Sequence, residues 1–416
     1  MARRLRTTVR TVALGMTALA AAWLSSTPAE ACTTFYVDHE GPTMGKSYDW
    51  YTTPGAVYVN KRGWKRTSMS VNALGDVYSE WTSKYASITF NDYGYRLPDG
   101  GVNEAGLAVD IMLLNDTTYP AADGRPSYNE VEWVQYALDN FASVVELAAA
   151  ADTYRISPLI AGFHYLACDT TGDCAAFEYL NGQLVITPAA SMPVKTLTND
   201  TYAASAAYLA QHEGFGGTDP IPTGYGSLDR FVRASWLMTQ PPALPVPDST
   251  FAIVDDVASG YGSPWRIVYR LAEGRAYWRT YNSPTVKHVD LSSFDLNCYS
   301  GDVMLDVDDP GAGDVSASFV PFDAVLNEQR LDASVEPFAD EFTEAERTFL
   351  VSYMATAHEQ QECTIEPPTG DGDDDDDSSD EGGCSVRQAG DSAPAWALLG
   401  LLGLGVGVAR RSRRLR

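Results

Sequence analysis

The sequence is short of positive charge. Lysine and arginine total 29 against 55 aspartate and glutamate residues, which gives a formal net charge of −26, and basic tracts occur only at the two ends. A chain with this charge repels the phosphate backbone of nucleic acids. No nucleic-acid partner is therefore expected.

Motifs that bind metals or cofactors are also missing. The 5 histidines are scattered, and neither H-E-x-x-H nor Cys-x-x-Cys spacing occurs. Asp306, Asp308 and Gly311 have the spacing that opens an EF-hand loop, but Pro310 and Ala317 stand where further calcium ligands belong. A solvated turn is the better interpretation, so we predict no metal and no cofactor.

Cysteine is scarce, with 6 in 416 residues. Cys168 and Cys174 flank an expected hairpin turn and could pair across it, and Cys298 with Cys363 is the next plausible pair. Sequence alone does not determine this connectivity. The assignment leaves two cysteines unpaired, Cys32 and Cys384.

Long apolar runs occur only near the ends. Four arginines between positions 3 and 10 precede an apolar stretch at 11–24, and Ala29 and Ala31 then form an A-x-A cleavage site. These features predict an export signal in residues 1–31. Its removal would make Cys32 the first residue of the mature protein, in an oxidising compartment that permits disulfides.

A cysteine at the mature N-terminus carries a thiol and a free α-amine on one residue. An α-amine titrates near ~7.7–8.0, so it can take the thiol proton near neutral pH, as in N-terminal-nucleophile enzymes. Two alternatives for Cys32 stay open. It could be an acylated lipoprotein cysteine, although Ala29 stands where a lipobox usually has Leu and Glu30 is unusual within one. It could also be half of a disulfide.

The residues between the two ends predict a large folded core. The chain is 45% hydrophobic and 11% aromatic, which suits one or two globular domains. Strands are expected at 33–37 and 45–50, with a turn between them that would return Asp49 towards Cys32. Nearly continuous apolar residues at 106–113 predict a buried strand.

Helices and further strands are expected downstream. Apolar spacing predicts a helix at 130–141 with Ser127 or Asn129 as N-cap, and capping boxes open helices after Ser143 and Thr343. Further expected elements are a hairpin at 162–186, a Ser227-capped helix at 228–238 and strands within 265–289. Strands, helices and strands again predict an α+β layered domain.

The composition changes after residue 366. Residues 367–383 include a run of five aspartates and predict an acidic, disordered linker. An apolar stretch at 394–409 follows Cys384 and is itself followed by five arginines. The stretch would span ~25 Å as a helix, slightly short of a ~30 Å hydrocarbon core, with the arginines on the cytoplasmic side.

Several stretches, in order, resemble the choloylglycine hydrolase and penicillin V acylase family of linear-amide C–N hydrolases. Each resembles a motif of that family, and any one of them alone is weak. Together they cover about residues 32–294. They are Cys32-Thr33-Thr34-Phe35, Gly45-Lys46-Ser47-Tyr48-Asp49-Trp50, Gly101-Val102-Asn103-Glu104-Ala105-Gly106-Leu107, Leu197-Thr198-Asn199-Asp200, Asp229-Arg230-Phe231-Val232-Arg233 and the strand pair Tyr277 to Asp290.

The resemblance implies a four-layer αββα N-terminal-nucleophile hydrolase fold in residues 32–366. It implies that Cys32 is nucleophile and, through its amine, base, and that Asp49 holds the amine and thiol. Asn199 matches the side-chain oxyanion donor, and Arg230 the cation near the thiolate, which should lower the thiol pKa. Leu113 falls where a backbone N–H supplies the second oxyanion donor.

One position departs from the family pattern. Lys46 stands where the family has arginine, so the charge is kept but the fixed fork of donors is lost. The geometry around Asp49 is therefore in doubt.

Structural interpretations remain for the matched residues. Asp49 could cap a turn, Asn199 could satisfy a loop and Arg230 could be an exposed helix residue. A papain-like pairing of Cys32 with His164 or His288 lacks the expected Cys-Gly-x-Cys-Trp context.

The C-terminal residues resemble a second pattern. Cys384, the apolar stretch and the arginines are similar to the MYXO-CTERM sorting tags of myxobacterial surface proteins, in which the Cys is the processing or attachment point. This resemblance implies residues 384–416 as a sorting tag with a transmembrane helix and a possible sorting protease. The protein would be periplasmic or at the cell surface, anchored through the tag or released after processing.

Two functional hypotheses follow. The first is an exported cysteine amidohydrolase that forms an acyl-thioester on Cys32 from a small-molecule acyl amide. Penicillin V-like, N-acyl homoserine lactone-like and bile-salt-like amides are the candidate substrates, and residues 112–114 with 118–120 look closer to the Gram-negative acylase branch. The second is a non-enzymatic surface lipoprotein or binding module acylated at Cys32. The oligomeric state stays open, a homo-oligomer included.

Overall fold

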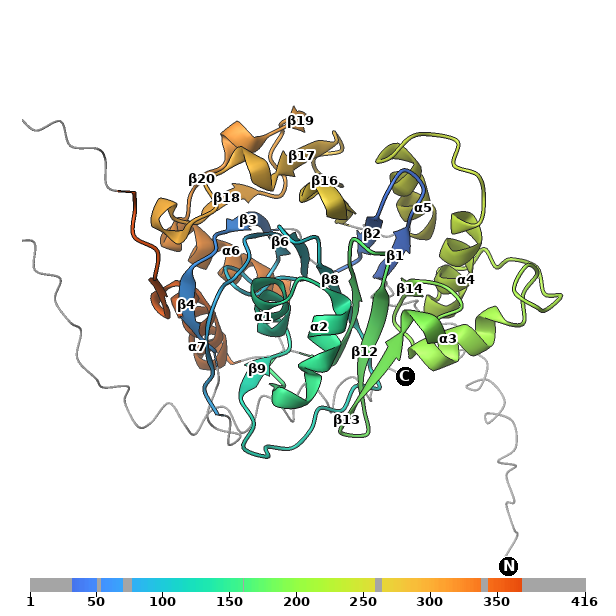
Figure 1. Cartoon of the computed structure of the whole chain (residues 1–416), viewed down its shortest axis with the longest axis horizontal. Coiled ribbons are helices and arrows are strands. Elements are labelled where there is room, and N and C mark those ends of the chain that lie inside the picture. The colour runs from blue at the N-terminus through green and yellow to red at the C-terminus, as the bar shows by residue number, and fades with distance from the viewer. Residues whose placement is uncertain are drawn as a thin grey trace, which may run out of the picture.

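Two large β-sheets packed face to face form the centre of the computed structural model (Figure 1). The structure describes residues 32–50, 54–69, 77–159, 161–258, 264–337 and 343–368. The predicted signal and sorting tag lie outside these ranges, as does the predicted linker apart from residues 367 and 368, so their boundaries stay predictions.

The first sheet has seven strands in the order β14-β1-β2-β15-β16-β17-β19. The strands predicted at its centre are confirmed, and β1 and β2 pair antiparallel with Thr34 opposite Lys46. Their bounds are Thr33–Val37 (β1), Thr43–Tyr48 (β2), Thr196–Leu197 (β14), Trp265–Arg270 (β15), Arg275–Thr280 (β16), Lys287–Asp290 (β17) and Gly313–Asp314 (β19).

The second sheet has nine strands in the order β13-β12-β11-β8-β7-β6-β3-β18-β20. It contains the predicted buried strand as β8 and the predicted hairpin as β11 and β12, which β13 extends. The bounds are Ala56–Asn60 (β3), Ser87–Asn91 (β6), Gly100–Asn103 (β7), Ala108–Leu113 (β8), Phe163–Cys168 (β11), Cys174–Leu180 (β12), Gln183–Pro188 (β13), Val303–Asp306 (β18) and Val320–Pro321 (β20).

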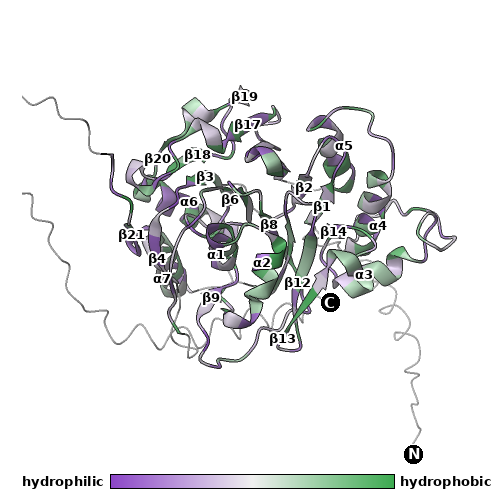
Figure 2. Ribbon diagram, viewed as in Figure 1, coloured by the Kyte–Doolittle hydropathy of each residue, from purple (hydrophilic) through white to green (hydrophobic). Residues whose placement is uncertain are grey.

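Helices cover the outer face of each sheet, which completes the four αββα layers. Helices α4 (Ser227–Met238) and α5 (Asp248–Val257) lie beside β1 and β2 in Figure 1, and their apolar residues pack on Phe35 and Val37. On the other side, residues of α1 (Glu132–Asn140), α2 (Val144–Ala149), α6 (Ala324–Val335) and α7 (Glu344–Ala355) form one core with the nine-stranded sheet. Helix α3 (Tyr202–Leu209) packs on α4. The central strands near β8 and β12 are largely hydrophobic in colour (Figure 2).

Of the predicted helix caps, that of Ser143 is confirmed, because its side chain accepts from the backbone N–H of Glu146 at the start of α2. The N-cap of α1 is Val131 rather than Ser127 or Asn129, although the Asn129 side chain accepts from the backbone N–H of Glu132 at 2.7 Å. The expectation for Ser227 was wrong. Gly226 is the N-cap of α4, and Ser227 is its first residue, whose hydroxyl donates to Thr198. A serine in the first turn is free for such a contact because its hydroxyl is not needed as a cap.

Both predicted disulfides are present, Cys168–Cys174 and Cys298–Cys363. Cys32 is the free cysteine among the described residues and is buried. Cys384 lies outside the described residues.

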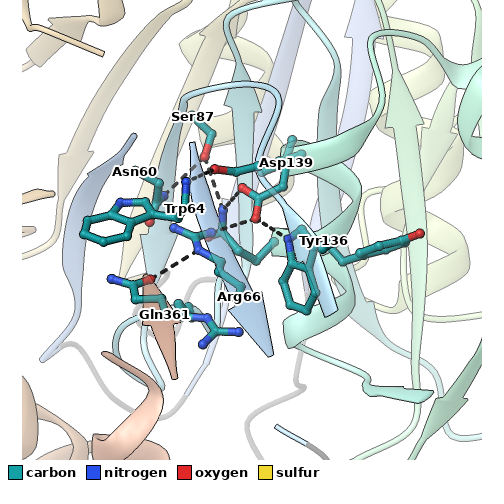
Figure 3. Close-up of polar contacts among 12 residues, drawn as sticks. Asn60, Trp64, Arg66, Ser87, Tyr136, Asp139 and Gln361 are labelled. Carbon is teal, nitrogen blue, oxygen red and sulfur yellow. Dashed lines mark hydrogen bonds and ion pairs between the residues drawn. The ribbon is translucent and has the colours of Figure 1, made fainter. Parts of the chain in front are cut away.

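A buried polar network connects the last described strand, β21 (Gln361–Cys363), with helix α1 on the outer side of the nine-stranded sheet. Strand β21 pairs with β4 (Trp64–Thr67), which pairs with β5 (Glu80–Thr82), while β9 (Ser127–Asn129) and β10 (Arg155–Ser157) form a separate pair. On β4, the Arg66 guanidinium donates to Asp139 of α1 at 2.7 Å and to the Gln361 side chain at 3.3 Å (Figure 3). The side chains of Arg66 and Asp139 are both fully buried.

Candidate active site

Cys32 lies beside a pocket at one end of the sheet sandwich. It immediately precedes β1 and is 5% exposed. The pocket has a volume of roughly 310 Å³, including space open to solvent, and most of its lining side chains are apolar or aromatic. They are Tyr48, Trp50, Tyr93, Ile111, Leu113 and Phe163, with Asp99 and Asn199 as the other polar groups besides Cys32.

The thiol of Cys32 is held in its neutral form. Burial raises its pKa to about 12, and the charge of Asp49 adds to the rise. The cations Lys46 and Arg230 lower the pKa, as does a hydrogen bond from the backbone of Asp49. The expected lowering by Arg230 is therefore present, but burial outweighs it. A base must take the thiol proton before the sulfur can attack.

Asp49 follows directly after β2, as the predicted hairpin requires. It is 3% exposed, and Ser47 donates to its carboxylate at 2.6 Å. The effects of its charge and its backbone on the Cys32 thiol place it next to the nucleophile.

Arg230 links the nucleophile to Asn199. Its guanidinium donates to the Cys32 carbonyl at 2.7 Å, to the Thr33 hydroxyl at 2.6 Å and to Asn199 Oδ1 at 2.8 Å. The side chain is buried, at 1% exposure, so Arg230 is not an exposed helix residue. These contacts join the start of β1 to helix α4.

The orientation of the Asn199 amide follows from its neighbours. A guanidinium can only donate, so Arg230 must face the amide oxygen. The amide Nδ2 then donates to the Leu113 carbonyl at 2.9 Å. Among the described residues its second hydrogen has no partner, and Asn199 lines the pocket. The backbone N–H of Asn199 donates to Ser227 Oγ at 2.8 Å.

The backbone of Leu113 faces the same region. Leu113 lies opposite Phe163 on β11, and the next N–H, that of Leu114, donates towards β11. Successive N–H groups of a strand point to opposite edges. The Leu113 N–H therefore points to the edge where Ile111 N–H donates to the Asp99 carbonyl, and Asp99 and Ile111 both line the pocket.

Lys46 joins the two sheets at this point. Its ammonium donates to the Asp99 carbonyl at 2.6 Å and lies 3.3 Å from an Asp110 carboxylate oxygen, with both side chains almost fully buried. Asp110 also accepts from the Thr34 hydroxyl at 2.7 Å. The Asp110 side chain leaves no room for a side chain at Gly100, where a Cβ would lie 1.8 Å from an Asp110 oxygen. Lys46 thus lowers the pKa of the Cys32 thiol through its charge, while its ammonium is paired with Asp110.

Comparison with known proteins gives relatives of one kind. No family model matches the chain. The chain is 30% identical over 255 residues to penicillin V acylase of Pectobacterium atrosepticum, a match that covers 56% of this chain and 65% of that protein, just under two thirds of its length.

Solved structures give the same result. Penicillin V acylase from Agrobacterium tumefaciens has a TM-score of 0.63 at 27% identity, covering 70% of this chain and 98% of that one. A variant of conjugated bile acid hydrolase from Clostridium perfringens has a TM-score of 0.54 at 18% identity, covering 64% and 94%. The chain has the N-terminal-nucleophile hydrolase fold. The acylase matches support the resemblance to the choloylglycine hydrolase and penicillin V acylase family.

Three residues of the site region were missed in the sequence, and a fourth, His164, was considered only as a papain-like partner of Cys32. Asp99 lines the pocket, and Asp110 pairs with Lys46. His164 contacts Glu178 and the carbonyl oxygen of Thr198, the residue before Asn199. Asp110 had a signal, because it is a charged residue inside an otherwise apolar strand, and such a residue needs a buried partner. The other three had no local pattern that pointed to the site.

Two further features concern binding partners. Within the described ranges, no three His, Cys, Asp or Glu side chains come together as a metal site would require. The same residues contain no helix both long and apolar enough to cross a bilayer. The stretch at 394–409 lies outside them.

Proposed function

We propose that the protein is an exported cysteine amidohydrolase that cleaves linear amide C–N bonds. The observation that carries the proposal is the unpaired Cys32 beside a largely apolar pocket, linked through Arg230 to the oriented amide of Asn199. Penicillin V-like, N-acyl homoserine lactone-like and bile-salt-like amides are the candidate substrates. The names of the similar acylases and of the bile acid hydrolase support this range.

The first half of the reaction transfers the acyl group to sulfur. Cleavage after Ala31 would free the α-amine of Cys32, which takes the thiol proton as the sulfur attacks the substrate carbonyl carbon. The resulting oxyanion would accept hydrogen bonds from Asn199 Nδ2 and the Leu113 N–H. The tetrahedral intermediate collapses by breaking the C–N bond, and the α-ammonium returns the proton to the leaving amine.

The second half releases the acid. The free α-amine takes a proton from water, whose oxygen attacks the thioester carbon through the same oxyanion site. Breaking the C–S bond then releases the carboxylic acid and restores the thiol. Asp49 would hold the α-amine, while Arg230 and Lys46 favour the negative charge on sulfur.

The rival hypothesis, a lipoprotein acylated at Cys32, is disfavoured by burial. A diacylglyceryl group needs a sulfur that reaches the membrane surface, but Cys32 is 5% exposed within the core between the sheets. For the C-terminal end we retain the proposal of a sorting tag with an anchoring helix.

The test combines processing with activity. The mature N-terminus is determined by intact mass, and the purified protein is assayed on a phenoxyacetyl amide, an N-acyl homoserine lactone and a glycine-conjugated bile salt. We expect a start at Cys32 and hydrolysis of at least one amide. A mature start elsewhere in an active protein would overturn the mechanism.

The variant Cys32→Ser should lose turnover by more than ~10³-fold, the scale seen when a nucleophile is removed. The serine hydroxyl has a far higher pKa than the thiol, so it should be a much poorer nucleophile in a site arranged around sulfur. Circular dichroism and thermal unfolding should match the wild type. Retained hydrolysis in this variant would refute Cys32 as the nucleophile.

A further inference from the structure

A buried histidine supports the segment that carries Asn199. His164 is fully buried on β11, and its ring contacts Glu178 of the neighbouring strand β12. Its Nε2 lies 2.6 Å from the carbonyl oxygen of Thr198, the residue before Asn199, and its Nδ1 lies 3.1 Å from Glu178 Oε1. The proposed mechanism does not use this residue.

The neighbours of His164 determine how many protons it holds. A carbonyl oxygen can only accept, so Nε2 carries a hydrogen. On the other side, Glu178 Oε1 already accepts from the backbone N–H of Tyr202 at 2.8 Å. With Glu178 ionised, either neutral tautomer of His164 would set a nitrogen lone pair against an acceptor, which leaves buried groups unsatisfied. The arrangement is complete when His164 is an imidazolium and Glu178 a carboxylate.

The segment 198–199 is thus held from two sides. His164 donates to the Thr198 carbonyl, and Ser227 of α4 contacts both the Thr198 hydroxyl and the Asn199 N–H. On the pocket side, Arg230 is the cation bonded to Asn199. On β8, the residue opposite His164 is the uncharged Met112.

We propose that His164 is a positioning residue: as an imidazolium paired with Glu178, it holds the Thr198 carbonyl and thereby fixes Asn199 beside Cys32. The inference rests on the proposed hydrolysis, since it assigns Asn199 a task there. It makes two separable claims, one about the protons on His164 and one about catalysis through Asn199.

The first claim is tested by ¹⁵N NMR of the histidine-labelled protein at about pH 8, where an ordinary histidine is mostly neutral. We expect both ring nitrogens of His164, assigned with His164→Gln, to show protonated shifts. His212 is the internal control. It is also buried, but only its Nδ1 faces an acceptor, the Pro220 carbonyl at 2.9 Å, and among the described residues its Nε2 has no partner. A bare nitrogen on His164 overturns the proposal.

The second claim is tested by kinetics on the best amide. Glu178→Gln and His164→Gln should lower kcat by between about tenfold and the ~10²–10³ expected for loss of Asn199 itself, with KM little changed. His212→Gln should leave both constants unchanged. In an Asn199→Ala background, His164→Gln should change kcat by no more than about twofold, because residues that act through one another are not additive.

The outcomes separate the two proposals. If the wild type hydrolyses no amide, the proposed function fails, while NMR still decides whether His164 holds two protons against Thr198. If hydrolysis occurs and His164→Gln lowers kcat by the same factor in the Asn199→Ala background as in the wild type, the positioning role is refuted. If His164→Gln does not fold, Glu178→Gln in the two backgrounds gives the same comparison.

Discussion

At the scale of single residues, the polar groups around Cys32 have separate and measurable tasks. Asn199 is oriented so that one amide hydrogen remains for the pocket. Removing an oxyanion donor acts on charge that develops in the transition state. Asn199→Ala should therefore lower kcat by ~10²–10³ with little effect on KM. Steady-state kinetics would contradict this role if the loss were confined to KM.

Asp99 should make stability depend on pH. Burial and the neighbouring Asp92 raise the pKa of its carboxyl to about 8, against ~3.9 in an unfolded chain. Between these values the folded protein binds a proton that the unfolded chain does not, so the free energy of unfolding falls as pH rises. Asp99→Asn should make this fall less steep, by on the order of 1 kcal/mol per pH unit.

Urea unfolding at several pH values between about 4 and 8 checks this expectation. Asn keeps an oxygen that can accept from the Asp92 N–H, which Asp99 binds at 2.7 Å, so the variant is close in shape. An unchanged slope would mean that another group of the cluster holds the proton. Asp92 is the other carboxyl group of this cluster, and the Tyr48 hydroxyl donates to it at 3.2 Å and to Asp99 at 3.5 Å.

At the scale of elements, strand β4 carries one buried and one exposed ion pair, and burial should change how much each contributes to stability. Arg66 pairs with Asp139 out of contact with water, whereas the neighbouring Lys65 pairs with Glu80 at 3.2 Å in solvent. Arg66→Met leaves Asp139 as an uncompensated buried charge, which should cost ~3–5 kcal/mol. Lys65→Met is the matched control and should cost ~0–1 kcal/mol.

Chemical denaturation of both variants measures the difference. Trp81 also donates to Asp139, at 2.7 Å, so part of the charge stays hydrogen-bonded in the variant. Equal effects of the two substitutions would show that the network does not hold β4 and α1 together.

Local patterns predicted most elements but not the contacts between sheets. Strand-forming composition, turn residues and a nearly continuous apolar run were sufficient for β1, β2 and β8, because these signals lie within a few residues of one another. The Lys46–Asp110 pair joins strands of different sheets, so no local pattern contains it. The wrong prediction of Ser227 as a cap has a similar cause. Its hydroxyl contacts Thr198, a residue distant in sequence, and no local pattern shows that contact.

The site was predicted as a set of positions rather than as a geometry. The ordered motifs indicated Cys32, Asp49, Asn199 and Arg230, and the structure brings all four together. The effect of Arg230 on the thiol pKa had the right direction, but the size of the burial effect depends on the whole core. The sequence alone does not show how deeply the core buries the Cys32 side chain.

At the scale of the whole molecule, the described chain closes with β21 and the Cys298–Cys363 disulfide. A protein ending at Glu366 keeps both, so we expect wild-type kcat/KM and an unchanged Tm. A protein ending at Gln360 loses β21 and the disulfide, which should cost ~2–5 kcal/mol. Activity assays and thermal unfolding of the two proteins make the comparison.

Fractionation of the full-length protein with antibodies to each end tests the proposed tag. The anchor proposal expects full-length chains in the membrane fraction, or chains shortened near Cys384. Full-length, unprocessed chains found wholly in the soluble fraction would contradict the anchor while leaving the enzyme proposal intact.

The position of β1 and β2 has a consequence for how the molecule reaches its native state. β1 pairs with β14 at Leu197, and β2 pairs with β15 at Trp265, so the β1–β2 hairpin that follows the nucleophile is flanked on both sides by strands far along the chain. Such pairings must overcome loop-closure entropy and form slowly. A ribosome must therefore synthesise most of the domain before Cys32 can be enclosed, and the reactive end assembles among the last parts of the fold.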